Sequence, residues 1–139
     1  MKRLNRTRLY CALLAIFAVS AIFNYLMWAH FQTSMGSENA ARIRKEIVEV
    51  HGVLIGILVG ALAARSKGRQ EIRPALAVVS IVISGLWVLY IGSTWIGYPD
   101  RIVANGPDGL IDQFNDRALQ LSTLVSGTLA YLSNKRVNG

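Results

Sequence analysis

The residues best suited to chemistry are two histidines and two glutamates that lie near the ends of two apolar segments. His30 closes the first apolar run, and Glu46, Glu49 and His51 stand where the second run begins. Imidazole and carboxylate groups bind divalent metals, and two histidines can hold a haem iron. If the two segments are antiparallel neighbours, we expect these four side chains at a similar height, as a polar cluster at one end of the helix pair.

The rest of the sequence argues against a bound cofactor. The chain has only two histidines and one cysteine, Cys11, so it forms no internal disulfide and no multi-thiolate metal site. No glycine-rich phosphate loop and no paired nucleophile and base stand out. We therefore predict no catalytic residues, no cofactor, and no haem or divalent metal at His30 and His51. Both histidines are expected to meet water and lipid headgroups instead.

The elements that must position these residues are apolar helices. Of the 139 residues 53% are hydrophobic and 17% charged, whereas soluble domains carry about 25% charged residues. Runs 9–31 and 75–97 have no charged residue and exceed the roughly 20 residues that span a bilayer. A shorter run follows a helix-forming stretch that begins near Glu38. We predict an all-α fold, a polytopic four-transmembrane-helix bundle forming one membrane domain over 1–139, with spans at about 9–31, 47–65, 75–97 and 114–133.

Charges between the spans predict the orientation. The two termini and the inner loop 66–74, with Arg65 ahead of it, hold ten basic residues and one acidic residue. The outer segments 32–46 and 98–113, with the adjoining helix ends, hold five basic and seven acidic residues. Short basic loops stay cytoplasmic. We predict a multi-pass plasma or inner membrane protein with cytoplasmic N and C termini, anionic lipids at that face, and no nucleic acid partner.

The second run carries a small residue every four positions, at Gly52, Gly56, Gly60 and Ala64, so this stripe lies on one face of a helix. Membrane helices associate through close packing of such faces, because lipid supplies little hydrophobic force between them. The stripe resembles the glycine zippers of some pore-forming and oligomeric membrane proteins. We favour packing within one bundle, and packing against another copy is the alternative. The predicted helix-packing residues are Gly52, Gly56, Gly60 and Ala64, with Ser122, Ser126 and Ala130 in the fourth run.

Ionisable residues are missing from the centre of every predicted span. Proton-coupled transporters place a carboxylate there, and small four-helix exporters carry a glutamate in the first helix, where this chain has Asn24. We expect a non-enzymatic membrane protein that acts by helix-mediated assembly, as a homo-oligomer or within a larger membrane complex. An oligomeric pore or channel-like subunit is its concrete form. A non-catalytic accessory subunit and a haem- or metal-binding redox subunit are the alternatives.

Overall fold

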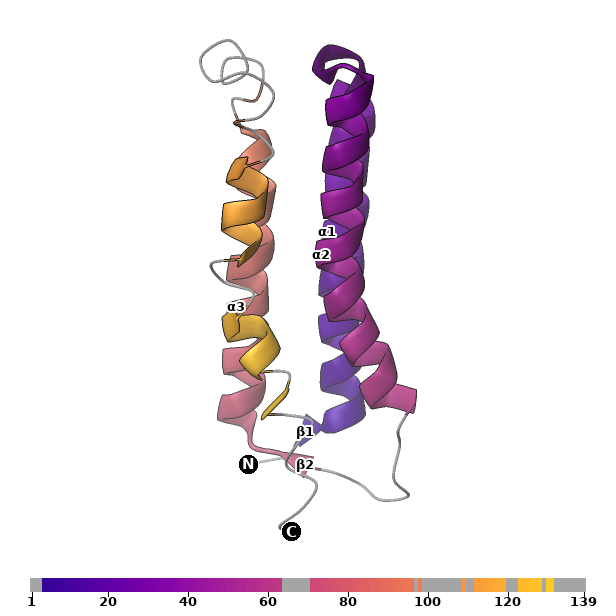
Figure 1. Cartoon of the computed structure of the whole chain (residues 1–139). Coiled ribbons are helices and arrows are strands. Elements are labelled where there is room, and N and C mark those ends of the chain that lie inside the picture. The colour runs from indigo at the N-terminus through magenta and orange to yellow at the C-terminus, as the bar shows by residue number, and fades with distance from the viewer. Residues whose placement is uncertain are drawn as a thin grey trace.

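The computed structural model consists almost entirely of long helices (Figure 1). Helix α1 spans Arg6–Met35, α2 spans Ser37–Ala63, and α3 spans Pro74–Gly92 and continues into the 3-10 turn η1, Ser93–Trp95. The all-helical class predicted from the sequence is confirmed. The structure describes residues 4–63, 71–96, 98, 109, 112–119, 123–128 and 130–131.

Helices α1 and α2 form a tight hairpin around one residue, Gly36. Its φ of 79° lies in the left-handed region, which glycine adopts without steric cost. The Ala40 amide donates to the Gly36 carbonyl at 3.0 Å, and the Asn39 side chain donates to the Met35 carbonyl at 3.2 Å. These bonds satisfy backbone groups at the ends of both helices. Because the turn is so short, residues about equally far from Gly36 lie level on the two helices.

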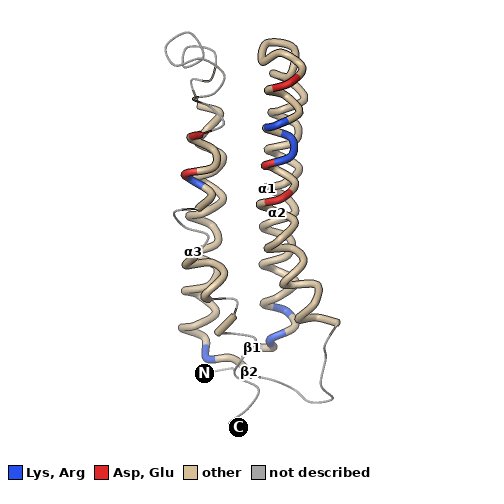
Figure 2. Tube along the Cα trace, viewed as in Figure 1, with Lys and Arg blue, Asp and Glu red and all other residues tan. Residues whose placement is uncertain are grey.

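The three long helices have the length and hydropathy of membrane spans. Charged residues are absent from α1 beyond Arg8, from α2 beyond Glu49, and from all of α3. Figure 2 shows the resulting uncharged zone. It lies between the charged residues in the upper half of α2 and the cations beside β1. Such a zone suits a hydrocarbon environment, in which an isolated charge is costly.

A further helical segment lies alongside α3, drawn in orange and yellow in Figure 1. Residues 112–119 and 123–128 are helical. The Arg117 guanidinium donates to the Ser93 hydroxyl at 2.7 Å, and the Trp87 indole N–H donates to the Ala118 carbonyl at 3.4 Å. Parts of the predicted span 114–133 lie outside the described residues, as do Ala64 and Ser122. The buried apolar residues of this segment are Phe114, Ala118 and Val125.

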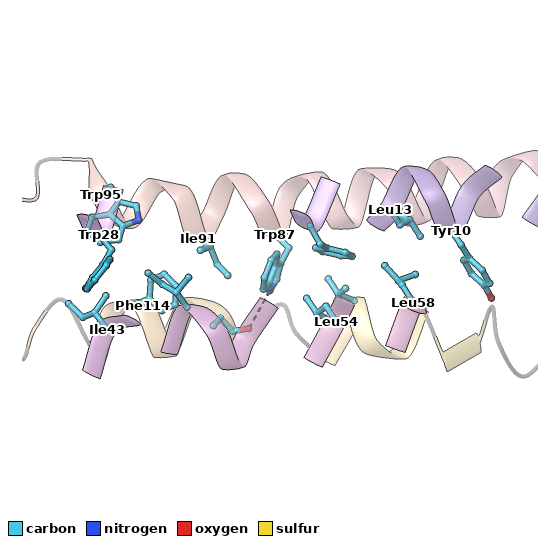
Figure 3. Packing of buried hydrophobic residues seen from close by; sticks show 14 of the residues in the cluster. Tyr10, Leu13, Trp28, Ile43, Leu54, Leu58, Trp87, Ile91, Trp95 and Phe114 are labelled. Atoms are coloured by element: carbon cyan, nitrogen blue, oxygen red, sulfur yellow. Dashed lines mark hydrogen bonds between the residues drawn. The ribbon is translucent and has the colours of Figure 1, made fainter. Parts of the chain in front are cut away.

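Trp87 fills the centre of the core. Its side chain is fully buried and points from α3 into the space between the helices (Figure 3). The indole makes edge-to-face contacts with Phe17 of α1 and His51 of α2, with ring centroids 5.5 and 5.3 Å apart. Such ring pairs add about 0.5–1.5 kcal/mol beyond area burial. One residue of α3 therefore joins α1, α2 and the segment that begins at residue 112.

Two very short strands, which sequence analysis did not predict, join distant parts of the chain. Strand β1 (Leu4–Asn5) pairs antiparallel with β2 (Glu71–Ile72), with Leu4 opposite Ile72. The Asn5 side chain also accepts from the Thr7 amide at 3.0 Å and so caps α1. The start of α1 is thereby held beside the segment that leads into α3.

Candidate functional site

The most specific feature of the interior is a chain of hydrogen bonds that connects three helical elements. The Trp95 indole N–H in η1 donates to Asn24 Oδ1 of α1 at 2.8 Å. Asn24 Nδ2 donates to the Ser20 carbonyl at 2.8 Å and lies 3.4 Å from the Ser20 hydroxyl. That hydroxyl lies 2.9 Å from Nε2 of His51, whose Nδ1 lies 2.8 Å from the Ile47 carbonyl of α2. We call Ser20, Asn24, His51 and Trp95 the polar chain.

The direction of each bond in the polar chain follows from the chemistry of its ends. An indole N–H only donates and a carbonyl oxygen only accepts, which fixes the orientation of the Asn24 amide. The Ile47 carbonyl likewise requires that His51 Nδ1 carries the hydrogen. In the neutral ring Nε2 is then an acceptor, and the Ser20 hydroxyl must donate to it. Every bond is thus compatible with its neighbours in a single arrangement.

Helical spacing places these groups. Ser20 and Asn24 are four residues apart on α1, and Ile47 and His51 are four apart on α2, so each pair lies on one helix face. The tight turn at Gly36 brings the two faces level. The four side chains of the polar chain are at most 4% exposed. An unpaired polar group in such surroundings costs about 1–3 kcal/mol. The two bonds that cross between elements, Ser20–His51 and Asn24–Trp95, therefore oppose separation of α1 from α2 and of α1 from η1.

The Ser20–His51 pair also has the hydrogen-bond arrangement of a nucleophile and its general base, with a carbonyl orienting the imidazole. This pair was not predicted from the sequence, because Ser20 and His51 lie in different segments and no motif connects them. Ser20 is 1% exposed and His51 is 2% exposed, so neither presents a surface to a substrate. The arrangement therefore acts as a link between α1 and α2.

The outer cluster expected from the sequence is not formed as predicted. His30 is exposed and its ring contacts the adjacent Phe31, with centroids 4.8 Å apart. His51 contacts Ser20, ten residues before His30, which is about 15 Å along α1. The expectation of a similar height was wrong because α2 begins at Ser37, directly after the turn at Gly36. By residue 51 the helix has therefore run back along α1 as far as Ser20. Glu46 is half-buried and Glu49 is exposed.

Metal-binding geometry is likewise not found among the residues that the structure describes. No group of three or more histidine, cysteine, aspartate or glutamate side chains there is placed to hold a metal ion. Glu49 pairs instead with Lys45 one helical turn away, at 3.6 Å.

The glycine stripe faces away from the other residues that the structure describes. Gly52, Gly56 and Gly60 are exposed, and a Cβ built on any of them meets no atom within 4 Å. The described residues thus do not supply the neighbouring helix that packing within the chain requires. In the later segment, Ser126 is half-buried and donates to the Thr123 carbonyl at 3.2 Å, and Ala130 is exposed.

Helix α2 therefore has two distinct faces. The buried face packs against the rest of the chain with a spacing of three and four residues, typical of helix packing. The opposite face carries charged residues in its first half and glycines in its second. We call this exposed set the outer face of α2: Glu38, Arg42, Lys45, Glu49, Gly52, Gly56 and Gly60.

Comparisons of the chain with protein-family models, curated proteins and solved structures find no match. The polar chain and the outer face of α2 are therefore the features of the molecule that bear on its function.

Replacing Asn24 by leucine tests the polar chain. The substitution keeps a buried side chain but leaves the Trp95 N–H and a Ser20 carbonyl contact without their partner, so we expect a loss of about 1–3 kcal/mol in unfolding free energy. The measurement is an SDS titration of the protein in detergent micelles. Thr94→Val is the matched control: Thr94 is fully buried in η1, and its hydroxyl has no partner among the described residues. Equal stability of the two variants would contradict the role of Asn24.

The hydrogen-bond directions predict the tautomer of His51. In ¹⁵N-labelled protein carrying His30→Gln, His51 is the sole histidine, because the chain has only two. We expect the ¹⁵N spectrum to show a protonated Nδ1 and an unprotonated Nε2, since the Ile47 carbonyl can only accept. A spectrum with the proton on Nε2 would show that the polar chain runs differently.

Proposed function

We propose that this is a small, non-enzymatic integral membrane protein that acts by helix-mediated assembly, with α2 as the contact helix. The observation that carries the proposal is the open space beside Gly52, Gly56 and Gly60. A glycine inside a helix costs about 1 kcal/mol relative to alanine. Three glycines lie on this one exposed face, and no packing contact with the described residues offsets their cost. In lipid, however, such a face lets another helix approach closely and gain van der Waals contact.

We further propose that the chain spans a plasma or inner membrane four times, with both termini in the cytoplasm. The charge asymmetry of the connecting segments supports this orientation. Arg6 and Arg8 at the start of α1 and Arg73 ahead of α3 fall on the side proposed to be cytoplasmic. These cations are suited to contact anionic lipid headgroups there.

An oligomeric pore is the concrete form that the assembly would take. The buried polar groups Ser20, Asn24 and His51 are engaged with one another inside one chain. A water path would therefore run between chains and not through the interior of one chain. A scaffold role in a larger membrane complex would use the same face of α2 without a water path. A partner that is another copy of the chain favours the pore, and a different protein favours the scaffold.

Gly56→Leu tests the proposal. A Cβ at position 56 meets nothing within 4 Å, so the single chain should fold, and its unfolding free energy should stay equal or rise by up to about 1 kcal/mol. The bulky side chain should nevertheless prevent another helix from approaching. We expect the complex sized in mild detergent, or by cross-linking in membranes, to shrink to the single chain.

Gly85→Leu provides the matched control. Gly85 lies in α3, and a Cβ there also meets no atom within 4 Å. This variant should keep the complex size of the unaltered protein. An unchanged complex with Gly56→Leu, or the same shrinkage in both variants, would overturn α2 as the contact helix.

A further inference from the structure

The charged half of the outer face of α2 indicates which partner binds there. Lys45 and Glu49 are exposed, with side chains 71% and 57% accessible, and form an ion pair at 3.6 Å. They lie on the same exposed side of the helix as Gly52 and Gly56, in steps of three and four residues. At 1.5 Å per residue, Glu49 lies about 4.5 Å and Lys45 about 10.5 Å from Gly52 along the helix.

We propose that the partner on this face is a second copy of the chain, with the two α2 helices side by side and parallel. In this pair Lys45 of each copy meets Glu49 of the other. The inference rests on the proposed function and names the partner and the register of that assembly. It requires no change in the fold, because the face is already exposed.

Membrane insertion sets the parallel arrangement. Copies of this chain should all enter a membrane the same way round, because ten of its fifteen basic residues lie on one predicted side. A pair related by a twofold axis along the membrane normal then brings each residue opposite itself. Helices that touch at Gly56 stay within reach of long side chains one to three turns away, where Glu49 and Lys45 lie.

The order of charges fits this pairing. A face with one sign of charge would repel its own copy, whereas Glu38, Arg42, Lys45 and Glu49 sum to zero. Each Glu49 would meet Glu49 of the other copy, but it would also have two Lys45 ammonium groups one turn away. Four alternating charges compensate one another better than one exposed pair does, because surface pairs alone contribute at most about 1 kcal/mol.

Lipid is a poorer cover for the same residues. The uncharged part of α2 begins at Val50, directly after Glu49, and Val48 and Val53 beside this face are 59% and 63% exposed. A carboxylate at the margin of an apolar surface loses hydration and benefits from an opposite charge. A second copy supplies apolar contact for the valines and a second ammonium group for Glu49, beside that of Lys45 in its own chain.

Charge reversal tests the pairing in the full-length chain. Two differently tagged copies are co-expressed, and one is captured from membranes solubilised in mild detergent. Lys45→Glu in both copies leaves only acids at these two positions, and Glu49→Lys in both leaves only bases. We expect either change to lower capture roughly fivefold to tenfold, because attraction becomes repulsion. Co-expression of a Lys45→Glu copy with a Glu49→Lys copy should restore capture.

Arg44→Glu is the matched control. Arg44 adjoins Lys45 in sequence but lies over the Trp28 ring of α1, 5.6 Å from its centroid, and not on the outer face of α2. This variant should capture itself as the unaltered chain does. Rescue in the mixed pair also separates loss of pairing from loss of folding, since two misfolded chains would not restore each other.

The outcomes distinguish this inference from the proposed function. If unaltered copies capture each other but both single reversals do so equally well, the Lys45–Glu49 pairing is wrong. If unaltered copies never capture each other while Gly56→Leu still shrinks a membrane complex, the partner is a different protein and the second copy is wrong. If Gly56→Leu changes no complex at all, the proposed function fails.

Discussion

The hydrogen bond between the Ser20 hydroxyl and His51 Nε2 is the interaction on which the rest of the arrangement depends. Polar groups in an apolar interior must be paired, so this bond fixes which faces of α1 and α2 meet. Asn24 extends the same constraint to Trp95, and the His51 ring packs against Trp87. The three long helices are thus positioned by a few polar contacts together with the packing of Trp87.

Sequence alone indicated the helices but not the pairing between them. Uncharged runs of sufficient length predict α1 and α3 directly, because bilayer thickness sets a length and charge is expensive inside it. Ser20 and Asn24 are separated by one helical turn in such a run, which was the available signal for a polar contact. His51, the partner of Ser20, was assigned to a surface cluster because the sequence does not show where the two helices turn. The position of that turn, at Gly36, decides which residues lie level.

The same pairing explains why the outer face of α2 is left open. Once His51 and its neighbours on the buried face contact α1 and α3, the glycines four residues apart must point away from both. The polar groups are engaged within the chain, and the small residues are left for contact outside it. Helix α2 therefore has one face packed against the rest of the structure and an opposite face that is exposed.

Disulfide cross-linking at position 56 tests the central claim, contact between chains through α2, most directly. The measurement uses Gly56→Cys in a Cys11→Ser background, oxidised in native membranes. A disulfide forms only when Cα atoms lie about 4.4–6.8 Å apart, which requires direct helix contact. We predict a covalent dimer from position 56 and little from Leu89→Cys, whose site on α3 is 72% exposed. No dimer from position 56, or equal yields from both sites, would contradict the account.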